Sequence, residues 1–336
     1  MHSVEEIADL FAGLEGHKVL VTTHAAPDGD ALGSVCAVSY ILETIGAEVK
    51  NILIDGFAKD FHWLLPPFPQ VQRFEELGAW VPDVFICVDC GDGFRPGGEI
   101  AEYFGNKVLP SAEWEKTLTV NIDHHLKNPL FGTYNIAQPD KAATAEIIGD
   151  IARVMEIPLA GALGEAVYTG IVTDTGNFTF SNTTSAIHAM VAEIVDYGLD
   201  VGVMTDKLYN NWSIARMHLW GKLMTDMSLH LDGRVVRSVI SLDLLESFGA
   251  DKGDLEGFAG WMRHLSGVDA SLLVREDGPG KVKISVRSMG QIDVRAVAEV
   301  FGGGGHRAAA GATLTMPVEE AADAVLEQLI EEVQRS

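Results

Sequence analysis

Short apolar segments alternate with helical patterns through the first half of the chain, and this alternation constrains the fold most. Four segments have the length and apolar content of strands buried on both faces: residues 18–24, 48–55, 83–89 and 118–124. Helical patterns follow them over residues 31–45, 142–156 and 163–172. Strands buried on both faces and separated by helices are typical of parallel sheets, so we predict an α/β domain with helices on both faces of its sheet.

The second half of the chain has a different pattern. Two pairs of strand-like segments each flank a turn, at Asp232-Gly233 and at residues 277–280, and an amphipathic helix pattern over residues 318–333 closes the chain. We therefore expect three parts: a parallel-sheet domain over residues 1–198, a connecting segment with a helix over 199–222, and a smaller α+β domain over 223–336.

The charge of the chain restricts its partners. Its 336 residues include 24 Lys and Arg against 48 Asp and Glu, a formal net charge of −24. A surface of this charge repels long nucleic acid, so a polyanionic substrate has to be short or locally neutralised. Metal ions held by some of the carboxylates would supply that neutralisation.

The sequence also indicates a compartment. The N-terminus lacks the basic start and apolar run of a signal peptide, and no apolar run approaches the roughly 18 residues that span a bilayer. Cys87 and Cys90 form a C-x-x-C motif without a second pair, and Cys36 lies in a helix pattern. This usage disfavours a zinc site or thiol chemistry and is typical of a reducing compartment, so we expect a cytoplasmic protein without a membrane segment.

Polar side chains gather where the predicted strands end, which is where parallel α/β sheets bind their ligands. The first strand leads into His24, Asp28 and Asp30, the third ends at Asp89, and the fourth ends in Asp123-His124-His125. A carboxylate such as Asp89 is costly to leave unpaired at the end of an all-apolar strand, and a metal would stabilise it. Taken alone, residues 27–30 also fit a turn and a helix cap.

The residue types suit divalent metals. Imidazole and carboxylate together favour Mn²⁺, with Zn²⁺, Co²⁺ or Mg²⁺ as alternatives. With Asp174, which closes a later apolar segment, the candidates number six, which suits two cations sharing a bridging carboxylate. Because adjacent strand residues point in opposite directions, we expect His124 and His125 to serve different partners, a metal and the substrate. The sequence contains neither a G-x-S-x-G nucleophile elbow nor a P-loop, so those classes of enzyme are disfavoured.

Six motifs in this order resemble DHH phosphoesterases over nearly the whole chain. Four of them resemble the metal-site motifs of that family: HAAPDGDALGS from His24, VDCGD from Val88, NIDHH from Asn121 and GIVTDTGNF from Gly170. The other two, SVRS from Ser285 and GGGGHRAAAG from Gly302, resemble the DHH-associated substrate-binding domain.

The resemblance implies a role for each matching residue. One metal is expected at His24, Asp28 and Asp89, and a second at Asp30, Asp89, His124 and Asp174, with Asp89 bridging the two. Asp123 is expected to orient a histidine, and His125 to contact the scissile phosphate. Across a cleft, the smaller domain is expected to bind a substrate phosphate through Arg287, Ser288, Gly303, Gly304, Gly305 and His306. For the glycine run, a flexible linker is the alternative.

The implied activity is hydrolysis of short oligoribonucleotides to nucleoside 5′-monophosphates, of 3′-phosphoadenosine 5′-phosphate (pAp) to AMP, or of both. Alternatives within the family are a phosphodiesterase for pApA or cyclic di-AMP and a RecJ-type single-strand exonuclease. A nucleotide-binding sensor without turnover is the alternative of a different class. The expected partners are short oligonucleotides or nucleotide bisphosphates, without long duplexes or membranes, and the resemblance is compatible with a homodimer.

Overall fold

The chain folds into two compact units, residues Met1–Asn211 and Trp212–Ser336. The computed structural model describes residues 1–64 and 66–336. The division falls inside the segment that the sequence indicates as a connection. That segment is largely helical: α7 (Val201–Tyr209) packs into the first unit through Met204, and α8 (Ile214–Asp226) packs into the second through Leu219.

The first unit contains a six-stranded parallel sheet with the strand order β3-β2-β1-β4-β5-β6. Its strands are β1 (Lys18–Thr22), β2 (Glu48–Ile52), β3 (Gln70–Val71), β4 (Val84–Val88), β5 (Leu118–Asp123) and β6 (Tyr134–Ala137). The direction in which strands are added reverses between the neighbours β1 and β4. In a sheet of this topology the loops beyond that point diverge and leave room for a ligand.

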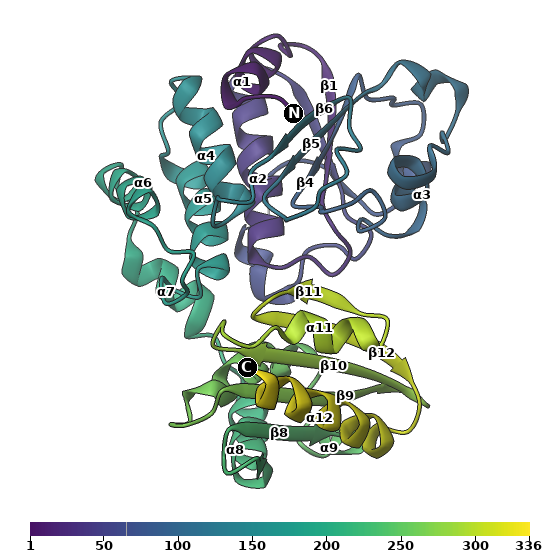
Figure 1. Ribbon diagram of the computed structural model, residues 1–336. Coiled ribbons are helices and arrows are strands. Elements are labelled where there is room, and N and C mark those ends of the chain that lie inside the picture. The colour runs from purple at the N-terminus through teal and green to yellow at the C-terminus, as the bar shows by residue number, and fades with distance from the viewer. Residues whose placement is uncertain (65) are drawn as a thin grey trace. The chain divides into compact units, whose positions relative to one another are not determined.

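Helices cover both faces of this sheet, which confirms the predicted α/β class (Figure 1). One face packs against α1 (Val4–Ala12), α2 (Gly29–Thr44), α4 (Thr144–Val154) and α5 (Gly161–Asp174), and α6 (Ser185–Asp196) joins α5. The other face packs against α3 (Gly98–Asn106) and the short helix Ala112–Lys116 around the aromatic residues Phe85, Phe104 and Trp114. All five residues of β4 are buried, as expected for a strand covered on both sides.

The second unit is an α+β domain, as expected, and its six-stranded sheet is mixed. The order β11-β12-β10-β9-β8-β7 is antiparallel except between β8 and β9. Its strands are β7 (Ser228–His230), β8 (Val235–Ile240), β9 (Ala270–Gly278), β10 (Lys281–Ser288), β11 (Gly304–His306) and β12 (Ala309–Thr315). One face carries α11 (Val294–Val300) and α12 (Val318–Arg335), and the other carries α8, α9 (Leu242–Ser247) and α10 (Phe258–Trp261).

Within residues 1–64 and 66–336, no helix combines the length and the apolar content needed to cross a membrane.

Candidate metal centre

Acidic and histidine side chains from the loops after β1, β4 and β5, from the start of α2 and from the end of α5 meet beyond the carboxyl ends of these strands. They form three groups, and within each group the ligand atoms lie within 4.8 Å of one another. The groups are His24, Asp28 and Asp89; Asp30, His124 and Asp174; and Asp89, His124 and His125. All six candidate metal ligands therefore lie in one site, and acidic and histidine groups are placed there to bind metal.

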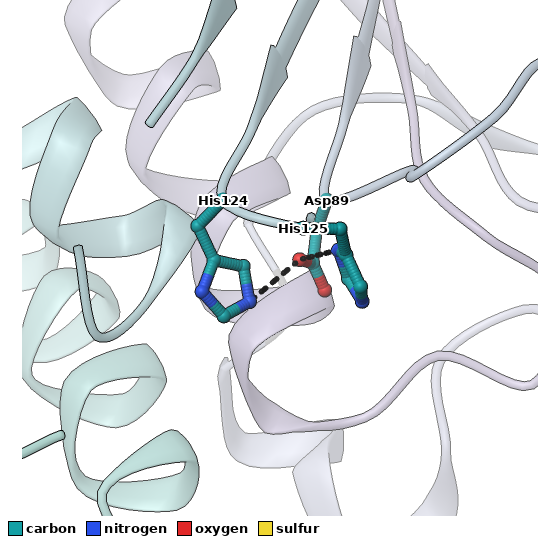
Figure 2. A group of neighbouring side chains, drawn as sticks. All are labelled: Asp89, His124 and His125. Atoms are coloured by element: carbon teal, nitrogen blue, oxygen red, sulfur yellow. Dashed lines mark ion pairs between the residues drawn. The ribbon is translucent and has the colours of Figure 1, made fainter. Parts of the chain in front are cut away.

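Asp89 lies at the centre of the site. Its Oδ2 is 3.5 Å from Nε2 of His24, and its Oδ1 is 3.7 Å from Nε2 of His124 and 3.6 Å from Nδ1 of His125. Figure 2 shows the two adjacent histidines on either side of this carboxylate. The backbone of Asp89 has a φ of +55°, a conformation that aspartate tolerates better than most residues and that turns the chain directly after β4.

The expectation that His124 and His125 point in opposite directions is wrong. Both rings approach Oδ1 of Asp89, and their centroids are 4.9 Å apart. The physical reason is that β5 ends at Asp123, so the alternation of side chains along a strand no longer applies to the two residues after it.

The imidazoles of His24 and His124 are oriented by backbone carbonyls. Nδ1 of His24 lies 2.9 Å from the Ala25 oxygen, and Nδ1 of His124 lies 3.3 Å from the Lys141 oxygen. A carbonyl can only accept, so each ring carries a proton on Nδ1 and turns Nε2 toward the carboxylates; loss of the Nε2 proton frees the lone pair that a metal would bind. Nε2 of His24 is buried and has no hydrogen-bond partner among the described residues, which is the geometry expected of a metal ligand.

Asp28 and Asp30 flank the start of α2. Asp28 caps that helix through the Ala31 amide at 3.1 Å, so the interpretation of residues 27–30 as a cap is correct and coexists with the grouping of Asp28 with His24. Asp30 is buried, and its two oxygens accept hydrogen bonds from the amides of Thr144 and Ala145 at 2.7 and 2.9 Å. The N-terminus of α4 therefore holds this carboxylate in place.

Close packing of α2 on α5 brings Asp30 near Asp174, the last residue of α5. A Cβ at Gly33 would lie 2.6 Å from the Ala166 carbonyl oxygen, and one at Gly170 would lie 2.5 Å from Oδ1 of Asp30. At Gly33 the backbone of α5 leaves no room for a side chain, and at Gly170 the side chains of Ala145 and Asp30 occupy the space. His124 spans the two carboxylates, with Nε2 3.3 Å from Asp174 and 3.9 Å from Asp30.

The carboxylates strongly perturb one another. Burial and the charge of Asp89 raise the pKa of Asp30 to about 7. Burial, together with Asp30 and Asp28, raises the pKa of Asp174 well above its usual value. Burial opposes ionisation of Asp89 as well, but the neighbouring histidines, His24 foremost, hold its pKa at about 2. Four aspartates placed this close require positive charge, and bound divalent cations would supply it.

His125 is held in a chain of polar contacts beside this cluster. Its Nδ1 lies 2.8 Å from Oδ1 of the buried Asp123, and its Nε2 lies 2.8 Å from Nη1 of Arg95. Because arginine can only donate, Nε2 accepts and the ring proton sits on Nδ1, shared with Asp123. Asn128 donates to the other oxygen of Asp123 at 2.6 Å and fixes that carboxylate in turn.

Sequence reasoning missed three residues of this site. Thr144 donates its hydroxyl to Oδ1 of Asp89 at 3.0 Å, Arg95 contacts His125, and Asn128 orients Asp123. Arg95 could have been found, because it is a cation in the loop directly after the VDCGD motif. Nothing local marks Thr144 or Asn128.

The predicted substrate-binding residues lie in the second unit. Arg287 is half-buried on β10 and donates to the carbonyls of Val286 and Ala310, at 3.0 and 3.5 Å. The neighbouring Ser288 is buried and donates its hydroxyl to the Ile292 carbonyl at 2.8 Å.

The glycine run is partly a strand rather than a loop or linker. Gly304–His306 form β11, which pairs with β12. A Cβ at Gly303 would lie 2.2 Å from the Gly311 oxygen, so close packing of backbones explains the absence of side chains there.

Family models match both units of the chain. The model of the DHH family, N-terminal domain, matches residues 18–171, and the model of the DHHA1 domain matches residues 233–335.

Two curated relatives span most of the chain. It is 32% identical to the bifunctional oligoribonuclease and PAP phosphatase NrnA of Thermus thermophilus, over 98% of this chain and 94% of that protein. It is 26% identical to the protein of the same name from Bacillus subtilis, over 88% of this chain and 89% of that protein.

One solved structure has the same fold over nearly its full length. It is the exopolyphosphatase-related protein of Bacteroides fragilis, with a TM-score of 0.87, 26% sequence identity, and coverage of 98% of this chain and 95% of that one.

Proposed function

Because the chain belongs to the DHH family, we propose that it is a metal-dependent hydrolase that degrades short oligoribonucleotides to nucleoside 5′-monophosphates and converts pAp to AMP. The family assignment made from the six motifs is confirmed. Two relatives that align over most of both chains carry names for these same two activities, which supports this substrate class over cyclic dinucleotides or long single strands.

The observation that carries the proposal is that the three ligand groups are joined into one site through Asp89 and His124. His24, Asp28 and Asp89 would hold one divalent cation, and Asp30, His124 and Asp174, with Asp89 shared, would hold the other. We favour Mn²⁺ because the donors mix imidazole with carboxylate. Divalent cations bound there would supply Lewis-acid activation of water and neutralise charge on the phosphate.

The remaining residues of the first unit position the substrate. His125 and Arg95 lie side by side, and we assign the oxygens of the scissile phosphate to both. Arg95 contacts them through its remaining N–H donors, and Nε2 of His125 does so when it carries a proton instead of accepting from Arg95. Asp123 keeps the ring of His125 in one orientation and tautomer. Phosphoester hydrolysis needs little covalent chemistry from the protein, so positioning and charge account for most of the rate.

In the second unit, we assign substrate phosphate contacts to Arg287, Ser288, Gly303, Gly304, Gly305 and His306. Of these, Arg287 provides the fixed positive charge. Ser288 already donates its hydroxyl to the Ile292 carbonyl, so it contributes to the shape of the site more than to charge.

The test is a side-by-side turnover assay of pAp, pApA, and labelled 5-mer and 24-mer RNA, each with Mn²⁺. We expect release of 5′-monophosphates from pApA and the 5-mer, AMP from pAp, and little cleavage of the 24-mer. Asp89→Ala and His124→Ala should abolish turnover. Asp196→Ala, which removes an exposed carboxylate at the end of α6, is the matched control and should leave turnover unchanged.

Three results would contradict the proposal. Full activity in purified, folded Asp89→Ala would refute the metal assignment. Binding of pAp without product, in Mn²⁺, Mg²⁺, Co²⁺ and Zn²⁺ alike, would identify a nucleotide sensor instead. Rapid cleavage of the 24-mer would favour a RecJ-type exonuclease.

A further inference from the structure

Two half-buried arginines lie next to each other in the second unit. Arg287 is on β10, and Arg263 is in the short helix Met262–His264 that directly follows α10. Among residues 1–64 and 66–336, no Asp or Glu lies within ion-pair distance of either guanidinium, although many other arginines of the chain have such a partner. Uncompensated charge of this kind is unusual below a protein surface.

The two side chains share one face and one end of the sheet. Arg287 pairs with Ser271 of β9, whose hydroxyl donates to the Ala259 carbonyl of α10 at 2.6 Å, so both strand residues face the α10 side. Arg263 comes from that side, and its Nη1 donates to the carbonyl of Ser288, the residue after Arg287, at 2.8 Å.

Most of the hydrogen-bonding capacity of this pair is unused. Each guanidinium has five N–H donors. Within the part of the chain that the structure describes, Arg287 donates only through Nη1, to two backbone carbonyls, and Arg263 donates only through Nη1, to the Ser288 carbonyl and the sulfur of Met289. Nε of Arg263 is buried and has no partner among the described residues. Burial, followed by repulsion from Arg263, lowers the pKa of Arg287. An anion bound to both guanidiniums would offset the cost of burying the charge and the repulsion between the two side chains.

The geometry of the two guanidiniums indicates which kind of anion they would bind. Paired guanidiniums bind phosphate through parallel N–H···O bonds, and a doubly charged phosphomonoester gains more from two cations than a singly charged phosphodiester. A carboxylate ligand could satisfy one guanidinium but leaves the second charge uncompensated.

We propose that Arg263 acts with Arg287 as a subsite for a terminal phosphomonoester of the substrate, the 5′-phosphate that is not cleaved. This inference rests on the proposed function and deepens it, because it makes the 5′-phosphate of pAp or of a 5′-phosphorylated dinucleotide a recognition element. Arg263 is then a specificity residue: it selects substrates that carry the monoester.

The test compares pApA with ApA, which lacks the 5′-phosphate, in the full-length protein with saturating Mn²⁺. In Arg263→Gln, we expect the KM for pApA to rise roughly tenfold or more, the loss typical of a charge-assisted hydrogen bond, while the kinetics of ApA stay the same. Arg263→Lys keeps the charge without the planar fork and should give an intermediate KM for pApA. Arg275→Gln, which removes a guanidinium paired with Asp277 on β9, is the matched control.

A second measurement does not depend on turnover. By calorimetry in EDTA, 5′-AMP should bind wild-type protein more tightly than adenosine, and Arg263→Gln should remove that difference. If Arg263→Gln weakens turnover of pApA and ApA equally, or binding of 5′-AMP and adenosine equally, Arg263 is merely structural and the inference is overturned. The inference is also overturned if Arg263→Gln changes none of these quantities. If the wild type cleaves neither dinucleotide, the oligoribonuclease part of the proposed function fails, and the AMP comparison still decides the role of Arg263.

Discussion

The hydroxyl of Thr144 donates a hydrogen bond of 3.0 Å to Oδ1 of Asp89, the carboxylate at the centre of the candidate metal centre. The amide of the same residue donates to Asp30 at 2.7 Å. One residue at the start of α4 therefore fixes a carboxylate from each ligand group, and it can influence metal binding without being a ligand itself.

We expect Thr144→Val to weaken Mn²⁺ binding roughly tenfold or more, because residues that hydrogen-bond to metal ligands typically contribute that much to affinity. Valine keeps the shape and the backbone amide, so only the hydrogen bond to Asp89 is lost. Titration calorimetry with Mn²⁺ measures the effect, and Thr144→Ser, which retains the hydroxyl, is the control. An unchanged Kd in Thr144→Val would mean that Asp89 needs no such support.

Without metal, the protein should become less stable as the pH rises from about 4 to about 7. The pKa of Asp30, raised to about 7, exceeds the value near 3.9 expected in the unfolded chain, so the folded state binds more protons through this window. The lowered pKa of Asp89 acts in the opposite direction, but only below about pH 4. Divalent metal should reverse the trend, because it binds the deprotonated carboxylates.

Thermal unfolding at pH 5 and pH 8, in EDTA and in excess Mn²⁺, measures both trends. Asp30→Asn cannot titrate, so it should flatten the dependence in EDTA and lose the stabilisation by Mn²⁺. A metal-free protein that is more stable at pH 8 than at pH 5 would show that the carboxylates do not repel one another as described.

Gly170→Ala should destabilise the protein and disturb the metal centre together. The added methyl would lie 2.4 Å from Cβ of Ala145 and 2.5 Å from Oδ1 of Asp30, and overpacking of this kind costs roughly 1–3 kcal/mol. Denaturant unfolding gives the stability, and a Mn²⁺ titration gives the affinity. Gly221→Ala in α8 is the control: apart from the adjacent turns of its own helix, no atom of the described residues lies within 4 Å of the new methyl, so helix propensity alone should stabilise the protein slightly.

The parts of the fold and site that follow from local pattern were predictable. Asp89 and His124 each directly follow a largely apolar strand, and parallel strands bring such ends together, so their meeting follows from the sequence. Thr144 was not predictable, because its contacts with Asp30 and Asp89 span 114 and 55 residues and arise from the packing of α4 against the sheet. Strand β11 was hidden for a related reason: its glycines oppose strand propensity and are explained only by the close approach of β12.

Asp123→Asn should lower kcat roughly 10–100-fold while leaving Mn²⁺ affinity nearly unchanged, because Asp123 orients His125 and belongs to none of the ligand groups. Asparagine has one acceptor oxygen, but Asp123 accepts from both His125 and Asn128, so one of the two bonds must be lost. Steady-state kinetics on pApA and calorimetry with Mn²⁺ separate the two effects. In the double variant Asp123→Asn/His125→Gln, turnover should be no slower than in His125→Gln alone, because Asp123 acts through His125; additive losses would assign it an independent role.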